Sequence, residues 1–555
     1  MSLYHKTAEI LSASGGNLKT RIFGNKALPP KASPQQVYAL ALETCKWSSI
    51  LTEVIEASEL LHYERKLPPL LSLLLVHDFL LAKRGIVLPA KHGLRASIER
   101  HKARLTAEFT RARIRRKAAT VEALRQQVTA EYLGEAAHHP RWVRVNTLKS
   151  TLEDQLDSTF KDFTRVYSIG EVTNTNNDAA SASPGKPLFY VDEHIPNLLA
   201  ISPAFEITKT KAYSSGAIIL QDKASCFPAY LLDPLPQDGD VIDSCAAPGN
   251  KTTHLAALVQ SRIVAAVREG EFEGAGDLKQ QQQQQQQKIF AFEKDKDRAR
   301  TLEKMVKVAG AKDVVRISLG QDFLKVDPDA DLFKNVGALL LDPSCSGSGI
   351  VGRDTMPALH LPKYASGKKA EPKKGGDRNS RKRKHPGDDD AAAAEKSREE
   401  EVFVDDDGEE IVVATAKELQ ARLEALSAFQ LSLLLHALAF PAARKVTYST
   451  CSVHAAENEQ VVRAALRSDV ARRRGWRILR RAEQVRGMRE WPVRGLVLPS
   501  DATSGDDDKR GDGDGGEDEG KGDDEEVVAD ACIRAYQGGG RGVMGFFVAG
   551  FVRDV

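Results

Sequence analysis

Apolar residues recur every three or four positions through most of the first 135 residues. Gln36–Leu61 and Leu67–Gly85 carry this spacing most clearly, and it is typical of helices that bury one face. We therefore predict a helical N-terminal domain over residues 1–135. Residues 136–215 begin with a strand-like stretch at Pro140–Ser150 and continue with mixed sequence, which predicts a small α+β segment.

From residue 216 onward, short apolar runs alternate with helical stretches. The runs VIDSC, KIFAFE, VVRISL and ALLLD read as strands, and helical signals lie at Lys251–Val259 and Lys296–Val308. This alternation is typical of a parallel sheet with helices on its faces. We predict that residues 216–555 form one α/β domain of this kind.

Three stretches interrupt the alternation, near residues 264–287, 353–410 and 501–526. The first ends in eight glutamines, and the third has 13 acidic residues against three basic ones. Segments of such composition bury too little apolar surface to order themselves, so we expect disordered surface loops. In the second, Arg381–Lys384 resembles part of a nuclear import signal, and a solvated charge run is the alternative.

Charge is segregated along the chain, and the net charge of +2 conceals this. Lys91–Lys117 holds ten Lys and Arg residues against two acids. A solvated helix face is one explanation of this composition. A phosphate-binding face is the sharper alternative, because clustered cations release counterions when they meet nucleic acid.

The six cysteines are far apart and form no CxxC pair. This spacing disfavours a zinc site and a disulfide framework, so we predict no bound metal and a reducing compartment. No run of eighteen apolar residues occurs, which predicts no membrane span. The first residues also lack the pattern of a signal peptide.

The stretch VIDSCAAPGNKTTHLAAL predicts a strand, a turn of small residues and a helix. Small residues let the backbone approach a ligand, and the helix N-terminus offers unpaired N–H groups. A nucleotide-binding fold places an acid at the end of the next strand, about 20 residues further on. Glu293 lies 44 residues after Gly249, and removal of the 24 residues of the 264–287 insert leaves 20. Asp322 and Asp342 end two further strands, so a cofactor site is favoured over an ordinary glycine turn.

Four motifs resemble, in chain order, those of the NSUN/RsmB-like RNA cytosine-C5 methyltransferases: DSCAAPGNKT, LLLDPSCSGSG, YSTCSVHAAENEQVV and GFFVAGF. PRWVRVNTLK and ILQDKASCFPAYLLDP look like the pre-catalytic segment of that family. The N-terminal region and the DPSCSGSG variant most resemble its fifth NSUN branch and the fungal counterparts, which methylate large-subunit rRNA. The resemblance implies a Rossmann-like, seven-stranded, S-adenosylmethionine-dependent methyltransferase domain whose partner is large-subunit rRNA or a pre-ribosome.

The same resemblance implies a set of cofactor-binding residues. Glu293 would take the ribose hydroxyls of S-adenosylmethionine, and Arg298 would lie beside the cofactor. Asp322 would approach the adenine, and Asp342 the methionine end or the target base. The loop that would wrap the amino-acid end of the cofactor consists of Cys245, Ala246, Ala247, Pro248, Gly249, Asn250 and Lys251.

Methylation of cytosine at C5 needs a thiolate, because C5 becomes nucleophilic only after a nucleophile adds to C6. Cys345 and Cys451 both follow predicted strands, and spacing alone does not rank them. A Pro-Cys cysteine is the nucleophile of DNA cytosine-C5 methyltransferases, which would point to Cys345. The RNA family uses its Thr-Cys cysteine, so the resemblance implies Cys451 as nucleophile and Cys345 as the residue that helps release the product.

Two further catalytic residues follow from this chemistry. Lys251 would help a nearby thiol to ionise, and Asp342 would hydrogen-bond the cytosine edge near N3. The other cysteines are expected to be small buried apolar residues, apart from Cys245, whose backbone would face the cofactor. These buried residues are Cys45, Cys226 and Cys532.

Two other functions compete with this interpretation. A DNA cytosine methyltransferase would lack the Thr-Cys motif and carry a target-recognition domain after its core. A ribosome-assembly factor whose main role is non-catalytic RNA binding is the stronger alternative. In either RNA-directed case we expect Lys91–Lys117 and Pro140–Ser150 to dock RNA, the protein to be a monomer, and its location to be the nucleus and nucleolus.

Overall fold

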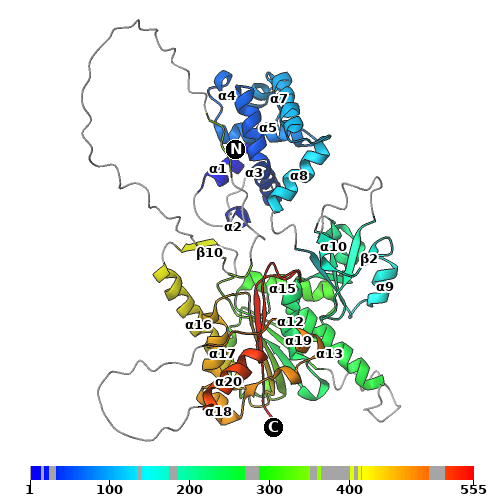
Figure 1. Ribbon diagram of the computed structural model, residues 1–555, viewed down its shortest axis with the longest axis vertical. Helices are drawn as coiled ribbons and strands as arrows, with labels where there is room; N and C mark the ends of the chain where they lie inside the picture. Colours follow the sequence, from blue (N-terminus) through cyan, green and yellow to red (C-terminus); the bar gives the residue numbers. More distant parts are fainter. Residues whose placement is uncertain are drawn as a thin grey trace, which may run out of the picture. The chain divides into compact units, whose positions relative to one another are not determined.

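The computed structural model of the chain divides into two compact units (Figure 1). The first unit comprises Met1–Gly134, Asp354–Phe403 and Asp407–Thr415, and the second comprises the remainder. The structure describes residues 2–13, 18–23, 33–133, 139–173, 186–203, 205–268, 287–350, 359–363, 401–404, 410–413, 416–498 and 519–554.

Helices make up the described N-terminal part of the first unit. The longest, α3, starts with a capping box between Ser33 and Gln36 and has proline at its first position, two features that favour a helix start. The leucine-rich helix α5 packs against α3 in the core of this unit. The helices are α1 (Leu3–Ser12), α2 (Leu18–Phe23), α3 (Pro34–Ala57), α4 (Leu60–Tyr63), α5 (Pro69–Leu81), α6 (Gly93–Glu99), α7 (Lys102–Arg115) and α8 (Val121–Leu133).

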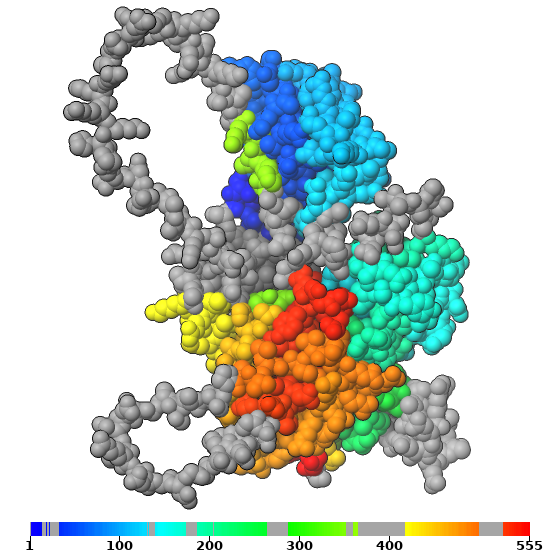
Figure 2. All heavy atoms as spheres, in the orientation of Figure 1, coloured from blue at the N-terminus to red at the C-terminus, as the bar shows by residue number. Residues whose placement is uncertain are grey.

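A short piece of the second predicted insert belongs to this unit. Residues 359–363 lie along α3 (Figure 2). The Thr52 hydroxyl donates to the His360 carbonyl at 2.8 Å, and the His360 N–H donates to Ser48 Oγ at 3.1 Å. The composition predicts a disordered loop over this whole insert. At these five residues that prediction is wrong, because backbone hydrogen bonds tie them to a helix.

The second unit begins with a five-stranded sheet in the order β2-β3-β4-β1-β5. All its pairs are antiparallel except β2–β3. The buried residues of these strands pack around Phe160 and Ile207. The elements are β1 (Arg141–Val145), α9 (Leu152–Asp157), β2 (Thr164–Val166), α10 (Ile169–Thr173), β3 (Leu188–Val191), β4 (Leu198–Ile201), α11 (Lys211–Ser215) and β5 (Ile218–Leu220).

The larger sheet of this unit runs β13-β15-β12-β9-β6-β7-β8, with β14 pairing on β15. Its first five strands along the chain are parallel, whereas β15 is antiparallel to β12, β13 and β14. The mixed α/β class is as predicted, but the sheet has eight strands rather than seven, because both β13 and β14 pair with β15. The strands are β6 (Asp240–Asp243), β7 (Ile289–Glu293), β8 (Val315–Leu319), β9 (Val336–Leu341), β12 (Lys445–Thr450), β13 (Arg477–Ile478), β14 (Ile533–Ala535) and β15 (Phe546–Val552).

Helices cover both faces of the larger sheet. Leu255 of α13 and Leu302 of α15 pack on one face, and Leu434 of α16 and Val462 of α17 pack on the other. This is the doubly wound arrangement that alternating strand and helix signals predict. The helices of this part are α12 (Lys223–Leu232), α13 (Asn250–Arg268), α15 (Lys296–Ala309), α16 (Ala416–Leu438), α17 (Glu459–Leu466), α18 (Asp469–Arg474), α19 (Arg486–Glu490) and α20 (Glu519–Ala531).

The predicted inserts lie mostly outside the described residues, as do seven of the eight glutamines and the Arg381–Lys384 cluster. Helix α13 continues to Arg268, beyond the expected end at Val259. The last glutamine of the run, Gln287, is buried and donates to the carbonyls of Leu235 and Gly239. A pair of strands, β10 (Glu401–Val404) and β11 (Glu410–Val413), forms a separate small sheet. Within the described part of the chain, no helix has the length and apolar character to cross a membrane.

Candidate active site

The carboxyl ends of the parallel strands meet at one edge of the larger sheet. Strand β6 ends at Asp243 and β7 at Glu293, while Asp342 and Cys451 directly follow β9 and β12. The strand order reverses between β6 and β9. Ligands of open α/β sheets bind outside the carboxyl ends at such a switch point, and the predicted site residues come together there.

The loop from Cys245 to Lys251 joins β6 to α13 at this switch point. Gly249 has a φ of +109°, and a Cβ there would lie 3.1 Å from Leu302 and Met305. Only glycine therefore fits the turn without strain. Helix α13 begins at Asn250, whose side-chain oxygen is buried without a hydrogen-bond partner among the described residues.

Asp243 stabilises this loop through a hydrogen bond with the first turn of α13. Its carboxylate accepts a hydrogen bond from the Thr252 hydroxyl at 2.7 Å, and the same hydroxyl lies 3.2 Å from the Ala246 carbonyl. Burial raises the pKa of Asp243 to about 7, against the opposing effect of the Thr252 hydrogen bond. These hydrogen bonds join the end of β6 to the first turn of α13, on either side of the small-residue loop.

The end of β7 contacts the same loop through Arg298. Glu293 is buried, its Oε1 accepts the Asp295 N–H at 2.9 Å, and its Oε2 lies 3.8 Å from Arg298 Nε. Arg298 also donates to the Ala247 carbonyl at 3.4 Å. Asp322 lies beyond β8, where it caps a short 3₁₀ turn through the Leu324 N–H and pairs with Lys294 at 3.3 Å.

Lys251 and Asp342 form an ion pair at the centre of the edge. Lys251 Nζ lies 2.6 Å from Asp342 Oδ2 and donates to Ser225 Oγ at 3.2 Å. The Ser449 hydroxyl donates to Asp342 Oδ1 at 2.6 Å. Burial alone would lower the pKa of Lys251, but the charges of Asp342 and Cys451 outweigh it, and this pKa is raised. Lys251 therefore stays charged at this edge of the sheet.

The two candidate cysteines face each other. Cys345 Sγ and Cys451 Sγ are 3.0 Å apart, although 106 positions separate them in the sequence. Cys345 is buried, whereas Cys451 is partly exposed. The hydrogen bond with Cys451 and then burial raise the pKa of Cys345 well above that of an ordinary thiol. Cys345 is accordingly the protonated member of the pair, and Cys451 is the accessible one.

Several residues that we did not single out from the sequence hold the cysteine loops. The Gly349 N–H donates to the Cys451 carbonyl, and the Gly545 N–H donates to the Gly349 carbonyl, each at 2.9 Å. Glu457 and Gln430 bind the backbone on either side of Cys345. Glu457 and Gly545 lie within motifs that we quoted, but the motif pattern alone did not indicate these contacts.

The basic segment of the first unit is less available to ligands than its charge suggests. Arg115 and Arg116 both pair with Glu53, and Arg113 donates to the carbonyls of Ala118 and Ala119. These contacts hold the C-terminal end of α7. The prediction that Lys91–Lys117 docks RNA stays a prediction, and these three arginines already have partners within the unit.

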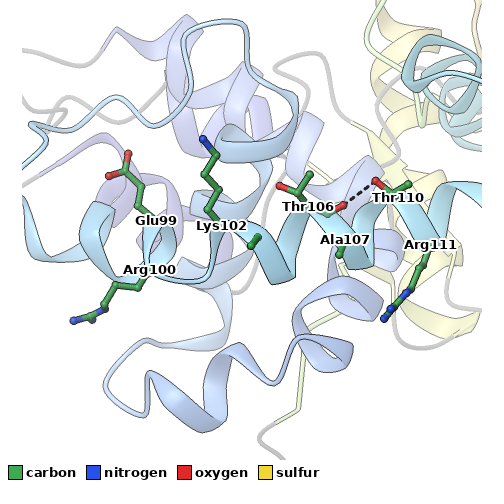
Figure 3. A pocket seen from close by; sticks show the side chains of 8 residues that line it. Glu99, Arg100, Lys102, Thr106, Ala107, Thr110 and Arg111 are labelled. Atoms are coloured by element: carbon green, nitrogen blue, oxygen red, sulfur yellow. Dashed lines mark hydrogen bonds between the residues drawn. The ribbon is translucent and has the colours of Figure 1, made fainter.

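A smaller basic area remains on α6 and α7. Figure 3 shows a shallow hollow in which Thr106, Ala107 and Thr110 present small side chains. Lys102 and Arg111 are exposed beside it. Arg111 pairs with the partly buried Glu108 on the same helix.

The predicted basic strand Pro140–Ser150 also differs from expectation. Arg144 of β1 is buried and donates to Gln221 Oε1 at 2.7 Å and to Thr253 Oγ1 at 3.0 Å. Lys149 donates to the Ser215 carbonyl at 2.7 Å. We assigned this segment to RNA docking from its charge, and for Arg144 that assignment is wrong, because its guanidinium joins the smaller sheet to α13 inside the protein.

Apposed thiols beside a Lys–Asp pair, at the switch point of a doubly wound sheet, are features of an α/β enzyme that uses thiol chemistry on a bound ligand. Residues 35–124 match the family model of the NOL1/NOP2/Sun domain family member 5 N-terminal domain, and residues 139–221 match the ferredoxin-like domain of the same family. The 25S rRNA (cytosine-C(5))-methyltransferase rcm1 of Schizosaccharomyces pombe is 37% identical over 83% of this chain and 78% of that protein. The chain therefore belongs to the NSUN5-type family of rRNA (cytosine-C5)-methyltransferases.

A second curated relative belongs to the same family. The 28S rRNA (cytosine-C(5))-methyltransferase of Mus musculus is 32% identical over 84% of this chain and 80% of that protein. Among solved structures, a methyltransferase homologue from Pyrococcus horikoshii is 19% identical, with a TM-score of 0.42 over 76% of this chain and 90% of that chain.

Proposed function

We propose that the chain is an S-adenosylmethionine-dependent rRNA (cytosine-C5)-methyltransferase that forms 5-methylcytosine in large-subunit rRNA. The observation that carries this proposal is the meeting of Lys251, Asp342 and two thiols at the switch point, in a chain whose relatives are named for methylation of 25S and 28S rRNA. A role in ribosome biogenesis and a nucleolar location follow from this substrate.

The residues at the carboxyl edge fit S-adenosylmethionine. The loop carries no bulky side chain between Cys245 and Gly249, and Gly249 leaves no room for a Cβ on the side of α15. The unpartnered oxygen of Asn250 offers an acceptor at this loop. Glu293 would hold the ribose hydroxyls, Arg298 would lie beside the loop and Asp322 would approach the adenine, in line with dinucleotide-type sites. When bound, the cofactor supplies an electrophilic methyl group.

In this proposal Cys451 is the nucleophile. Its sulfur is accessible and lies near the charged Lys251, which favours the thiolate. The thiolate adds to C6 of a cytosine that has left its stack, and the electron pair of the C5–C6 double bond then makes C5 nucleophilic. Asp342, held by Lys251 and Ser449, would hydrogen-bond the cytosine edge near N3 and favour this addition.

Cys345 acts in the second half of the reaction. After the methyl group is on C5, the C5 proton must leave and the bond between C6 and the Cys451 sulfur must break. Formation of that bond removes the Cys451 charge and hydrogen bond that raise the pKa of Cys345. The Cys345 thiol would therefore lose its proton to solvent more readily at this stage. Its thiolate would accept the C5 proton, and the electron pair of the C5–H bond would restore the C5–C6 double bond and expel the Cys451 thiolate. This order of events supports a release role for Cys345.

The cellular substrate is tested by bisulfite sequencing of large-subunit rRNA. Cells that lack the protein should lose 5-methylcytosine at one or more positions, and re-expression of the wild-type chain should restore it. The Cys451→Ala chain should not restore it. An unchanged methylation map in the deletion cells would contradict the proposed function, and full rescue of growth by Cys451→Ala would favour a non-catalytic assembly role.

We further propose that the first unit docks RNA through the basic area on α6 and α7. The hollow is lined by small side chains of α7, and Lys102 and Arg111 lie beside them (Figure 3). Exposed cations next to an open hollow suit a phosphate backbone, which is recognised by charge rather than by sequence.

The Lys102→Glu/Arg111→Glu double variant should bind an rRNA fragment more weakly and keep its cofactor affinity. The slope of log affinity against log salt should fall by about one unit for each phosphate that the variant no longer neutralises, which fluorescence anisotropy at several salt concentrations measures. Lys83→Glu/Arg84→Glu is the matched control, because these exposed residues carry the same charge elsewhere on the unit. Equal weakening by both double variants would argue against the α6–α7 area.

A further inference from the structure

The side chain of Glu457 lies between the loops of the two cysteines. It is the last residue of the 3₁₀ turn η7 (Ala455–Glu457) and is fully buried. This turn follows Cys451 along the chain, whereas Cys345 comes from a different strand. A carboxylate in this position can bind both loops at once.

The carboxylate holds the Cys345 loop on both sides of the thiol. Glu457 Oε1 accepts the Ser346 N–H at 2.9 Å, and Oε2 accepts the Ser346 hydroxyl at 2.6 Å. Glu457 Oε1 also accepts from Gln430 Nε2 at 3.0 Å, and the same nitrogen donates to the Ser344 carbonyl at 3.0 Å. Both residues that flank Cys345 are therefore bound to this carboxylate, one directly and one through Gln430.

The Cys451 loop is connected to the Glu457 carboxylate through the Ser346 hydroxyl, and to the backbone of Glu457 through Tyr448. The hydroxyls of Ser346 and Ser452 lie 3.1 Å apart, and Ser452 directly follows Cys451. The Tyr448 hydroxyl, from the strand that leads to Cys451, donates to the Glu457 carbonyl at 2.5 Å and lies 3.1 Å from Gln430 Oε1. Displacement of Glu457 would disturb the distance between the two sulfurs.

The side-chain hydrogen bonds that the described residues give to the Glu457 carboxylate come from neutral groups. Its described side-chain partners, Ser346 and Gln430, are both neutral. A buried carboxylate without a cation is costly, and an amide of the same shape would make most of these hydrogen bonds without that cost. A role limited to holding the two cysteine loops together therefore does not explain why residue 457 is a glutamate rather than a glutamine.

We propose that Glu457 is a positioning residue that fixes the two cysteine loops against each other and whose carboxylate keeps the Cys345 thiol protonated while Cys451 attacks. The inference rests on the proposed function and deepens it. The titratable groups that face Cys345 are Cys451, Glu457 and Tyr448. Burial raises the pKa of Tyr448 well above its usual value, so this phenol stays neutral.

The charge of Glu457 affects which of the two thiols ionises first. After the Cys451 hydrogen bond and burial, the charges of Cys451 and Glu457 add to the raised pKa of Cys345. Before RNA binds, Glu457 thus opposes a thiolate at the buried Cys345, and Cys451 is the accessible thiol. Only Cys451 then competes for C6. Without the Glu457 charge, both sulfurs would become candidates.

The test compares Glu457→Gln with Glu457→Asp in the full-length protein. The first keeps the shape and removes the charge; the second keeps the charge and shortens the side chain. Alkylation of Cys345 by iodoacetamide is followed over a range of pH and assigned by peptide mass spectrometry. Because this measurement uses neither RNA nor cofactor, it remains informative if the protein methylates no rRNA, which would count against the proposed function alone.

For Glu457→Gln we expect the alkylation midpoint of Cys345 to move to lower pH by about one unit, with a melting temperature at or above that of the wild type. The kcat for methyl transfer should fall at least about tenfold, and KM for RNA should stay the same. The midpoint in Glu457→Asp should stay near that of the wild type. A wild-type midpoint or a wild-type kcat in Glu457→Gln would overturn the inference.

Ser346→Ala provides a second variant in case Glu457→Gln does not fold. It removes the hydroxyl that Glu457 Oε2 accepts from and leaves the charge in place. We expect its kcat to fall at least about tenfold while the alkylation midpoint of Cys345 stays unchanged. A kcat at the wild-type level would overturn the positioning role.

Discussion

The Cys451→Ala protein should bind S-adenosylmethionine as tightly as the wild type and transfer no measurable methyl group to RNA. Loss of a covalent nucleophile removes the only route by which C5 of cytosine becomes reactive, and comparable substitutions in other enzymes lower kcat by about three orders of magnitude or more. Labelled methyl transfer to an rRNA fragment measures activity, and isothermal titration measures cofactor affinity.

The matched control for this substitution is Cys45→Ala. Cys45 is a buried thiol in the core of the first unit, and burial raises its pKa to about 12. It has no part in the proposed chemistry, so its variant should keep wild-type activity at a temperature where it is folded. Near-normal methyl transfer by Cys451→Ala would refute the assignment of the nucleophile.

The Cys345→Ala protein should accumulate a covalent complex with RNA. Cys451 remains free to attack C6, but the thiol that lies 3.0 Å away, to which we assign product release, is missing. On a denaturing gel, we expect a slowly migrating band that needs both RNA and S-adenosylmethionine, and turnover should fall by at least about a hundredfold.

The Cys345→Ala/Cys451→Ala double variant controls for this band. It should form none, because the nucleophile is absent. A clean gel for Cys345→Ala, together with a normal rate of product formation, would remove the release role from Cys345. Cys451→Ala and Cys345→Ala therefore test the two proposed roles separately, although the two thiols are hydrogen-bonded to each other.

The sequence predicted the positions of the proposed cofactor-binding residues at the carboxyl ends of the strands better than the contacts between the two cysteine loops. Small residues at Cys245–Lys251 and the acid at Glu293 could be found because strand, turn and helix follow each other locally. The spacing to Glu293 fitted once the 264–287 insert was removed, and Glu293 does end β7. Local pattern also indicated that Cys345 and Cys451 follow strands.

The proximity of the two thiols could not be predicted from local pattern. It depends on the parallel pairing of β9 with β12, two strands separated by more than 100 residues that include an insert. The same limit applies to Glu457, whose role depends on contacts with Ser346 across that gap. The family resemblance indicated which motifs belong together, but not which side chains touch.

Charge was the least reliable signal. A run of arginines in Lys91–Lys117 indicated a binding face, yet Arg115 and Arg116 pair with Glu53, an acid more than 60 positions away. Arg144 was expected at a surface and is buried against α13. The sequence shows how many cations a segment contains, but the acids that pair with them come from distant positions in the chain.

The central claim is that Cys451, and not Cys345, attacks the cytosine ring. RNA that carries 5-fluorocytidine at the target position tests it directly, because fluorine cannot leave C5 as a proton does and the adduct persists. After protease and nuclease digestion, mass spectrometry of the trapped complex should find the modified nucleotide on the peptide that contains Cys451. A nucleotide on the Cys345 peptide would contradict the account.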